Sequence, residues 1–320
     1  MFILQHNRLL SALSLFCFLW IPAAFCAEEP TTHLPQLNPE SRQLLAKFFE
    51  YDSTIPLESR TVEVKTVDGV AREKIVIRST QGFLAPGYLQ LPAIGSGPYP
   101  CVLLLHGWSG SKESWYQDNN YISGGNTRKR LLENGYAVLM LDAQCHGDRI
   151  ASNDFAPVNH HIDETVPVGQ RRKGYFTQCE IYLQTVVDYR RAIDYLSTRE
   201  EINADRIGVI GYSMGGAQAF MLTAVESRIK ATVACATPSE NQPFTLYAPQ
   251  NYAPDLGDRP FFMVSGKNDP MCSIAHAKEL YSLISARMKD LRFYEGGHRL
   301  KPDFVPHAVE WITMHVGQKP

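Results

Sequence analysis

The chain has 320 residues, of which 44% are hydrophobic and 20% charged, a composition typical of a folded globular protein. Its 31 basic residues nearly balance its 33 acidic residues, and no long basic run occurs. The charge pattern therefore gives no basis for binding nucleic acid or an anionic membrane surface, and we expect a small molecule or a peptide as the partner.

Residues 1–26 resemble a secretory signal peptide. A basic start that ends in Arg8 leads into the uncharged run 9–25, and acidic residues follow the small residues at its end. The run is slightly shorter than the roughly 20 residues that a membrane-spanning helix needs, and Pro22 lies near its end. We therefore expect export to the periplasm or the medium, with no stable membrane insertion after the leader is removed.

Five cysteines remain once the leader is excluded: Cys101, Cys145, Cys179, Cys235 and Cys272. An odd number cannot pair completely, and most of the five lie in or beside apolar runs, where a cysteine usually acts as a small buried hydrophobic residue. One disulfide remains possible, and the sequence does not assign its partners.

Residues 27–60 are predicted to form an arm and one helix. The helix is expected over Ser41 to Tyr51, where Leu44, Leu45 and Phe48 have the spacing of an amphipathic face. Residues 61–91 alternate apolar and polar positions between turn residues, which predicts antiparallel strands.

After a Pro- and Gly-rich linker, continuous apolar runs alternate with helical periodicity. Strands are expected at 101–107, 136–142, 206–213, 229–236, 261–266 and 291–296. Helices are expected near 127–134, 178–197, from 214, near 274–286 and at 304–316. Apolar runs without alternation are typical of strands buried on both faces of a parallel sheet, so this part of the chain predicts an α/β fold.

Two polar stretches, near 145–176 and 238–259, follow predicted strands at their carboxyl ends. Ligands bind at this edge of open α/β sheets, so the two stretches are candidate substrate walls or a small cap; surface loops without a function are the alternative. Three arginines in the first stretch are candidates for reaching a substrate carboxylate: Arg149, Arg171 and Arg172.

The residues Gly211-Tyr212-Ser213-Met214-Gly215 form a G-x-S-x-G pattern between a predicted strand and a predicted helix. In that context the pattern is typical of a nucleophilic serine on a sharp turn. A serine hydroxyl needs a base and an acid, and Asp269 and His298 each follow a later predicted strand. We predict the triad Ser213, Asp269 and His298. The alternatives, which lack that placement, are Asp255, Asp258 and His276.

The negative charge that forms on the substrate oxygen needs hydrogen-bond donors. The backbone N–H of Met214, after the nucleophile, and that of Trp108, after the strand at 101–107, are the predicted donors of this oxyanion hole. His106 is expected to brace the loop by hydrogen bonding and not to act as a base.

Five motifs in order, LLLHGWSGSKES, LMLDAQCHGDR, GYSMGG, SGKNDP and GGHR, resemble the α/β-hydrolase superfamily. The resemblance is greatest to its dienelactone hydrolase-like and small serine esterase branches, although dienelactone hydrolases proper use cysteine where Ser213 stands. It implies a catalytic domain over 61–318 with a mostly parallel central sheet, antiparallel N-terminal strands and helices on both faces. It also implies the triad and the oxyanion hole named above.

These features predict an exported serine hydrolase that cleaves small-molecule carboxylic esters through an acyl-enzyme. The alternatives are a serine peptidase of the prolyl-oligopeptidase type and a non-catalytic binding protein with the same fold. We expect no cofactor and no metal, because the sequence has no H-E-x-x-H and His160-His161 alone is too little for a metal site. The substrate and the oligomeric state stay open.

Overall fold

The computed structural model describes residues 33–150, 176–242 and 245–317. Its contacts divide the chain into Met1–Thr31 and Thr32–Pro320, and all described residues belong to the second unit. The predicted leader at 1–26 lies outside the described residues, as do most of the stretch near 145–176 and two residues of the stretch near 238–259.

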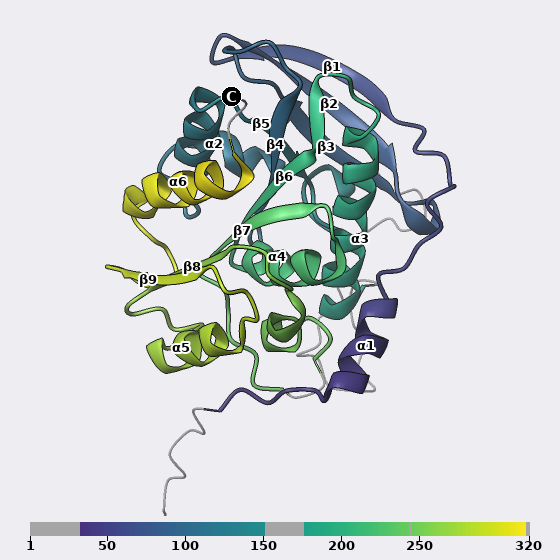
Figure 1. Ribbon diagram of the computed structural model, residues 1–320. Helices are drawn as coiled ribbons and strands as arrows, with labels where there is room; N and C mark the ends of the chain where they lie inside the picture. The colour runs from purple at the N-terminus through teal and green to yellow at the C-terminus, as the bar shows by residue number, and fades with distance from the viewer. Residues whose placement is uncertain (1–32, 151–175, 243–244, 318–320) are drawn as a thin grey trace, which may run out of the picture. The chain divides into compact units, whose positions relative to one another are not determined.

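A nine-stranded sheet forms the centre of the second unit (Figure 1). Its strands in chain order are β1 (Arg60–Val67), β2 (Val70–Arg78), β3 (Leu84–Gln90), β4 (Tyr99–Leu105), β5 (Ala137–Leu141), β6 (Ile202–Tyr212), β7 (Ile229–Cys235), β8 (Phe261–Gly266) and β9 (Lys289–Tyr294). Their order across the sheet is β1-β2-β3-β5-β4-β6-β7-β8-β9. The pairs β1–β2, β2–β3 and β3–β5 are antiparallel, and all later pairs are parallel. The predicted fold class is confirmed.

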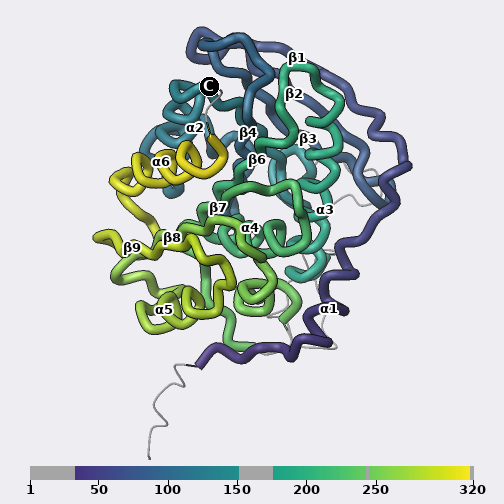
Figure 2. Tube along the Cα trace, viewed as in Figure 1, coloured from purple at the N-terminus to yellow at the C-terminus, as the bar shows by residue number. Residues whose placement is uncertain are grey.

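Helices cover both faces of the sheet. They are α1 (Pro39–Lys47), α2 (Gly124–Glu133), α3 (Gln178–Leu196), α4 (Met214–Val225), α5 (Ile274–Leu283) and α6 (Val305–Val316). The hydrophobic core on one face includes side chains of α1, α3, α4 and α5, and the core on the other face includes those of α2 and α6. Figure 2 shows α6, at the end of the chain, beside α2, with which it is in contact.

The first helix differs from its prediction in both position and buried face. It begins at Pro39, because the Asn38 side chain accepts the N–H of Ser41 and proline suits the first position of a helix. It ends at Lys47 instead of Tyr51. The predicted apolar face was wrong in part, because Leu45 is buried whereas Leu44 is 62% exposed and Phe48 59% exposed.

The long helix α3 agrees closely with its predicted range. Thr177 begins it with a capping box, in which the Thr177 hydroxyl accepts the N–H of Glu180 and the Glu180 carboxylate accepts the N–H of Thr177. By contrast, α5 ends at Leu283, before the predicted end at 286, because Ile284 has an extended backbone.

Three further observations concern the described residues alone. Cys101, Cys235 and Cys272 have free thiols, and all three are buried. None of the described helices is long and apolar enough to span a bilayer. Within the described ranges, no three His, Cys, Asp or Glu side chains gather where they could hold a metal ion.

Candidate active site

Ser213 occupies a sharp turn between β6 and α4. Its φ of 58° and ψ of −116° lie in a region that residues other than glycine rarely adopt. A hydrogen bond of 2.9 Å from its N–H to the oxygen of Cys235 holds the turn against β7. A Cβ on Gly211 would lie 2.0 Å from the Gly215 oxygen, and one on Gly215 would lie 2.1 Å from the Leu105 oxygen. The two glycines therefore allow β6, α4 and the end of β4 to approach one another.

The three residues of the predicted triad lie in hydrogen-bonding contact. Ser213 Oγ is 2.7 Å from His298 Nε2. His298 Nδ1 is 3.0 Å from Asp269 Oδ2 and 3.2 Å from Oδ1. The Asp269 carboxylate is fully buried and also accepts the N–H of Met271 at 2.8 Å. A proton on Nδ1 of His298 would bond the carboxylate and leave Nε2 free to accept the serine proton.

The sheet order explains why residues so far apart in sequence meet. Ser213 follows β6, Asp269 follows β8 and His298 follows β9, all within the parallel run β6-β7-β8-β9. The carboxyl ends of parallel strands share one edge of the sheet, so the three loops converge there. The catalytic roles of the three residues stay a prediction at this point.

The turn that follows β4 passes directly beside the nucleophile position. A Cβ on Gly107 would lie 3.1 Å from the Cβ of Ser213. A hydrogen bond of 3.0 Å from the N–H of Gly110 to the Gly107 oxygen closes the turn. The ring of Tyr121 packs against both glycines, since a Cβ on Gly110 would lie 2.4 Å from the Tyr121 hydroxyl. A side chain at position 107 would therefore crowd Ser213, and one at position 110 would collide with the Tyr121 hydroxyl.

The imidazole of His106 sets the orientation of the peptide that carries the Trp108 N–H. His106 Nε2 accepts the N–H of Ala143 at 3.0 Å, so Nδ1 must carry the proton, which it donates to the Gly107 oxygen at 2.8 Å. The C=O and N–H of one trans peptide point in opposite directions, so a fixed Gly107 carbonyl also fixes the Trp108 N–H. Burial lowers the pKa of His106 to about 4, which keeps it neutral at neutral pH. These bonds agree with the bracing role expected for His106.

Both predicted oxyanion donors adjoin this region. Trp108 follows Gly107 in the turn, and Met214 follows Ser213 as the first residue of α4. The first N–H groups of a helix have no partner within the helix, which suits the Met214 N–H to an external acceptor. Their role as donors stays a prediction.

Aromatic rings from four separate segments contact one another in series, beginning with Trp108 in this turn. The ring centroids of Trp108 and His146 are 5.2 Å apart, and those of Trp108 and Tyr182 are 6.5 Å apart. Tyr182, on α3, packs in turn against Tyr247, with ring centroids 4.5 Å apart and the ring planes tilted by 34°. These four residues could not be predicted as a group from the sequence, because they share no motif and meet only through the fold. A series of ring contacts therefore connects Trp108, a predicted oxyanion donor, with α3 and Tyr247.

A buried ion pair links the loops that follow β4 and β5. Lys112 Nζ lies 2.7 Å from Asp142 Oδ2, with the lysine side chain 1% and the aspartate side chain 0% exposed. Asp142 also accepts the backbone N–H of Lys112 at 2.8 Å and that of Asp148 at 2.9 Å. Burial by itself lowers the pKa of Lys112, but the charge of Asp142 and the hydrogen bonds outweigh it, so the pKa is raised and the lysine stays charged.

The side chains kept as alternatives for the triad are engaged elsewhere. Their partners are all outside the serine site: Asp255 pairs with Arg42, Asp258 pairs with Arg287, and His276 Nδ1 is 3.1 Å from the hydroxyl of Ser239.

Arg149, a candidate for binding a substrate carboxylate, is instead buried. Its guanidinium pairs with the fully buried carboxylate of Asp188 on α3. This pair ties the end of the loop after β5 to α3, so we no longer assign Arg149 to substrate. Arg171, Arg172 and His160-His161 lie outside the described residues.

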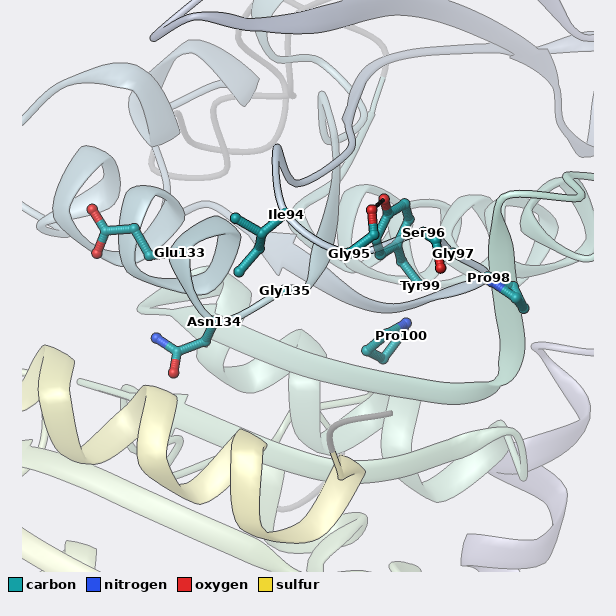
Figure 3. A pocket seen from close by; sticks show the side chains of 10 residues that line it. All are labelled: Ile94, Gly95, Ser96, Gly97, Pro98, Tyr99, Pro100, Glu133, Asn134 and Gly135. Atoms are coloured by element: carbon teal, nitrogen blue, oxygen red, sulfur yellow. Dashed lines mark hydrogen bonds between the residues drawn. The ribbon is translucent and has the colours of Figure 1, made fainter. Parts of the chain in front are cut away.

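A second feature of the fold is a hollow of about 250 Å³. The side chains that line it are drawn in Figure 3. Its lining residues are 94–100, which lead into β4, and 133–135, which lead into β5. The amino ends of these strands lie at the sheet edge opposite to that of Ser213. The hollow is therefore separate from the candidate active site.

Comparison with known proteins shows similarity to one family. Residues 100–256 match the family model of the α/β-hydrolase fold. The hydrolase YtaP of Bacillus subtilis (strain 168) is 28% identical over 185 residues, which are 55% of this chain and 58% of YtaP. The 2,6-dihydropseudooxynicotine hydrolase of Paenarthrobacter nicotinovorans is 27% identical over 57% of this chain and 37% of its own length. The chain thus spans about half the length, or less, of these two relatives.

Solved structures agree on the fold. An acetyl xylan esterase from Paenibacillus sp. R4 superposes with a TM-score of 0.64 at 18% identity, covering 86% of this chain and 92% of that protein. At this level of identity the likeness concerns the fold alone. The sheet order, the turn at Ser213 and the family model lead to one conclusion: the chain has the fold of the α/β-hydrolase superfamily.

Proposed function

We propose that this protein is an exported serine hydrolase that cleaves carboxylic esters through an acyl-enzyme intermediate. The observation that carries the proposal is the hydrogen-bonded chain from Ser213 through His298 to the buried carboxylate of Asp269. A serine beside an imidazole that is itself oriented by a carboxylate is the arrangement that activates an alcohol as a nucleophile. The names of the relatives, hydrolases and an esterase, support the same reaction class.

In the first half of the proposed reaction, Ser213 Oγ attacks the ester carbonyl carbon and its proton passes to His298 Nε2. The negative charge that develops on the carbonyl oxygen is bound by the N–H groups of Trp108 and Met214. One such donor typically contributes about 10²–10³ in kcat. The carbon–oxygen bond to the alcohol then breaks, and His298 returns the proton to the departing oxygen. The products are a free alcohol and an acyl group on Ser213.

Water completes the reaction by the same steps. His298 Nε2 takes a proton from a water molecule, whose oxygen attacks the acyl carbon, and the bond to Ser213 Oγ then breaks as His298 returns the proton to Oγ. The carboxylic acid leaves. Throughout, the Asp269 carboxylate keeps the proton of the imidazole on Nδ1 and stabilises the imidazolium form.

The proposed substrate is a small-molecule ester. The rings of Trp108, Tyr182 and Tyr247 contact one another in series from the turn after β4, and we propose that they favour a substrate with an apolar group. A peptidase of the prolyl-oligopeptidase type and a non-catalytic binding protein remain the alternatives, and no contact among the described residues favours either. The proposal of export rests on the leader-like sequence at 1–26.

The test uses the mature protein, without the leader. Wild type should hydrolyse p-nitrophenyl acetate and react covalently with a fluorophosphonate probe, whereas Ser213→Ala should do neither and should melt at a similar temperature. Ser282→Ala removes an exposed serine hydroxyl on α5 that donates to the backbone oxygen of Glu279, and it should leave both activities unchanged. Hydrolysis that persists in Ser213→Ala would refute the nucleophile. Faster cleavage of a matched p-nitroanilide than of the ester would favour the peptidase instead.

A further inference from the structure

The tyrosine inside the serine motif is bonded to the loop that carries the histidine. Tyr212 is the last residue of β6 and is 1% exposed. Its hydroxyl donates to the backbone oxygen of His298 at 2.7 Å and accepts the backbone N–H of Leu300 at 2.9 Å. One phenol oxygen therefore bonds the main chain on both sides of residue 299.

Side-chain alternation along β6 explains how Tyr212 reaches this loop. Tyr212 and Ile210 belong to the core on the face of the sheet covered by α2 and α6, and the loop crosses to that face on its way from β9 to α6 (Figure 1). The ring packs against Phe304, with centroids 6.1 Å apart, and against Tyr121, with centroids 6.0 Å apart. Packing from two sides fixes the ring. Burial raises the pKa of its phenol, so the hydroxyl stays protonated and can donate.

The loop itself has little regular structure to define its position. It runs from the end of β9 at Tyr294 to a short helical turn before α6, and a single antiparallel bridge joins Gly296 to Leu300. Gly296 has a φ of 126°, a conformation that glycine adopts readily and other residues do not. The imidazole of His298 must nevertheless keep Nε2 within 2.7 Å of Ser213 Oγ. Its main chain therefore needs an anchor outside the loop.

We infer that Tyr212 is a positioning residue: it fixes the backbone of the base loop to the same central strand that ends in the nucleophile, and so holds His298 Nε2 in reach of Ser213 Oγ. This inference rests on the proposed function. Because Tyr212 and Ser213 are adjacent in the chain, any small displacement of β6 moves nucleophile and base together. Tyr212, the residue between the first glycine and the serine of the G-x-S-x-G motif, thus positions the loop that carries His298.

Tyr212→Phe isolates the hydroxyl, because phenylalanine retains the ring packing and loses both hydrogen bonds. The loop then gains freedom, and misplacement of a catalytic group by about 1 Å can cost as much as 10²-fold in rate. We expect kcat for p-nitrophenyl acetate to fall about tenfold, and KM to stay within about twofold, because substrate contacts are unchanged. The rate of fluorophosphonate labelling should fall by a similar factor, since it requires the same proton transfer from Ser213 to His298.

Tyr189→Phe is the matched control. Tyr189, on α3, is also 1% exposed, and its hydroxyl also bridges two backbone groups: it accepts the N–H of Leu141 at 3.0 Å and donates to the oxygen of Leu104 at 2.7 Å. Its loss should lower the melting temperature about as much as the loss of the Tyr212 hydroxyl, while kcat stays within about twofold of wild type.

The outcomes separate the inference from the proposed function. Wild-type kcat in Tyr212→Phe, or an equal loss of kcat in Tyr189→Phe, would overturn the positioning role while the proposed function stands. A wild-type protein that neither hydrolyses the ester nor takes the label would overturn the proposed function itself. If Tyr212→Phe does not fold, hydrogen exchange of the wild type decides: the Leu300 amide should be protected like the amides of β6, and exchange typical of an open loop would refute the anchor.

Discussion

The buried pair of Lys112 and Asp142 gives a prediction whose size follows from its geometry. Lys112→Met removes the ammonium that lies 2.7 Å from Asp142 Oδ2 and leaves a carboxylate whose side chain is 0% exposed. Two backbone N–H groups still bond that carboxylate, but they do not cancel its charge. An uncompensated buried charge of this kind costs about 3–5 kcal/mol, out of a total free energy of unfolding of about 5–15 kcal/mol.

The double variant Lys112→Met/Asp142→Asn tests whether the loss of stability comes from the unpaired charge of Asp142. It removes both charges, retains an oxygen acceptor at position 142 and should recover at least about 2 kcal/mol relative to Lys112→Met alone, because buried ion pairs add little net stability over neutral replacements.

Urea unfolding of the three proteins at neutral pH, followed by tryptophan fluorescence and circular dichroism, measures these free energies. A loss below about 1 kcal/mol in Lys112→Met would show that water reaches Asp142 and that the reasoning from burial is wrong. A double variant no more stable than Lys112→Met would show that the lysine side chain stabilises by packing and not by its charge.

Three further predictions concern the same edge of the sheet. Asp269→Asn should lower kcat for ester hydrolysis by a factor of about 10³–10⁴, because the imidazole of His298 loses its correct orientation. Asp258→Asn loses an exposed ion pair and should change kcat by less than about twofold. Ester hydrolysis assays of both variants measure these changes. Burial lowers the pKa of both His106 and His146 to about 4. Between a pH of about 6.5 and 4, the unfolded chain therefore binds more protons than the folded protein. The free energy of unfolding should fall as the pH drops through that range, by roughly 3 kcal/mol at most for each histidine. Urea midpoints that do not change over this range would contradict neutral burial of the two rings. Gly215→Ala should prevent folding or lower the melting temperature steeply, because its Cβ would lie 2.1 Å from a backbone oxygen of β4, and an unchanged melting temperature would refute that packing.

Much of the fold could be predicted because its signals are local. The apolar runs at 101–107, 206–213 and 261–266 predicted buried parallel strands, and β4, β6 and β8 lie there. Helix ends were less accurate: α1 is set by the cap at Asn38, which precedes the predicted start, and its buried face depends on which side the body of the protein covers.

Some residues of the candidate site could likewise be predicted from local motifs, and others could not. Ser213, Asp269 and His298 could be named from motifs at strand ends, and the fold brings these three side chains together. The roles of Tyr212 and Lys112 could not be predicted in this way. A tyrosine in a motif usually faces solvent or packs against its neighbours, and a lysine after a glycine turn usually faces solvent.

The sequence alone determined the class of fold, the order of its elements and the identity of the residues predicted to react, because hydrophobic periodicity and the glycines around Ser213 act over a few neighbouring positions. Only the tertiary structure decided that Asp142 would neutralise Lys112, that Arg149 would be buried against Asp188, and that the Tyr212 hydroxyl would bond the backbone on both sides of residue 299. Such contacts join segments far apart in the chain, and their partners are selected by the packing of the whole sheet, which no local pattern encodes.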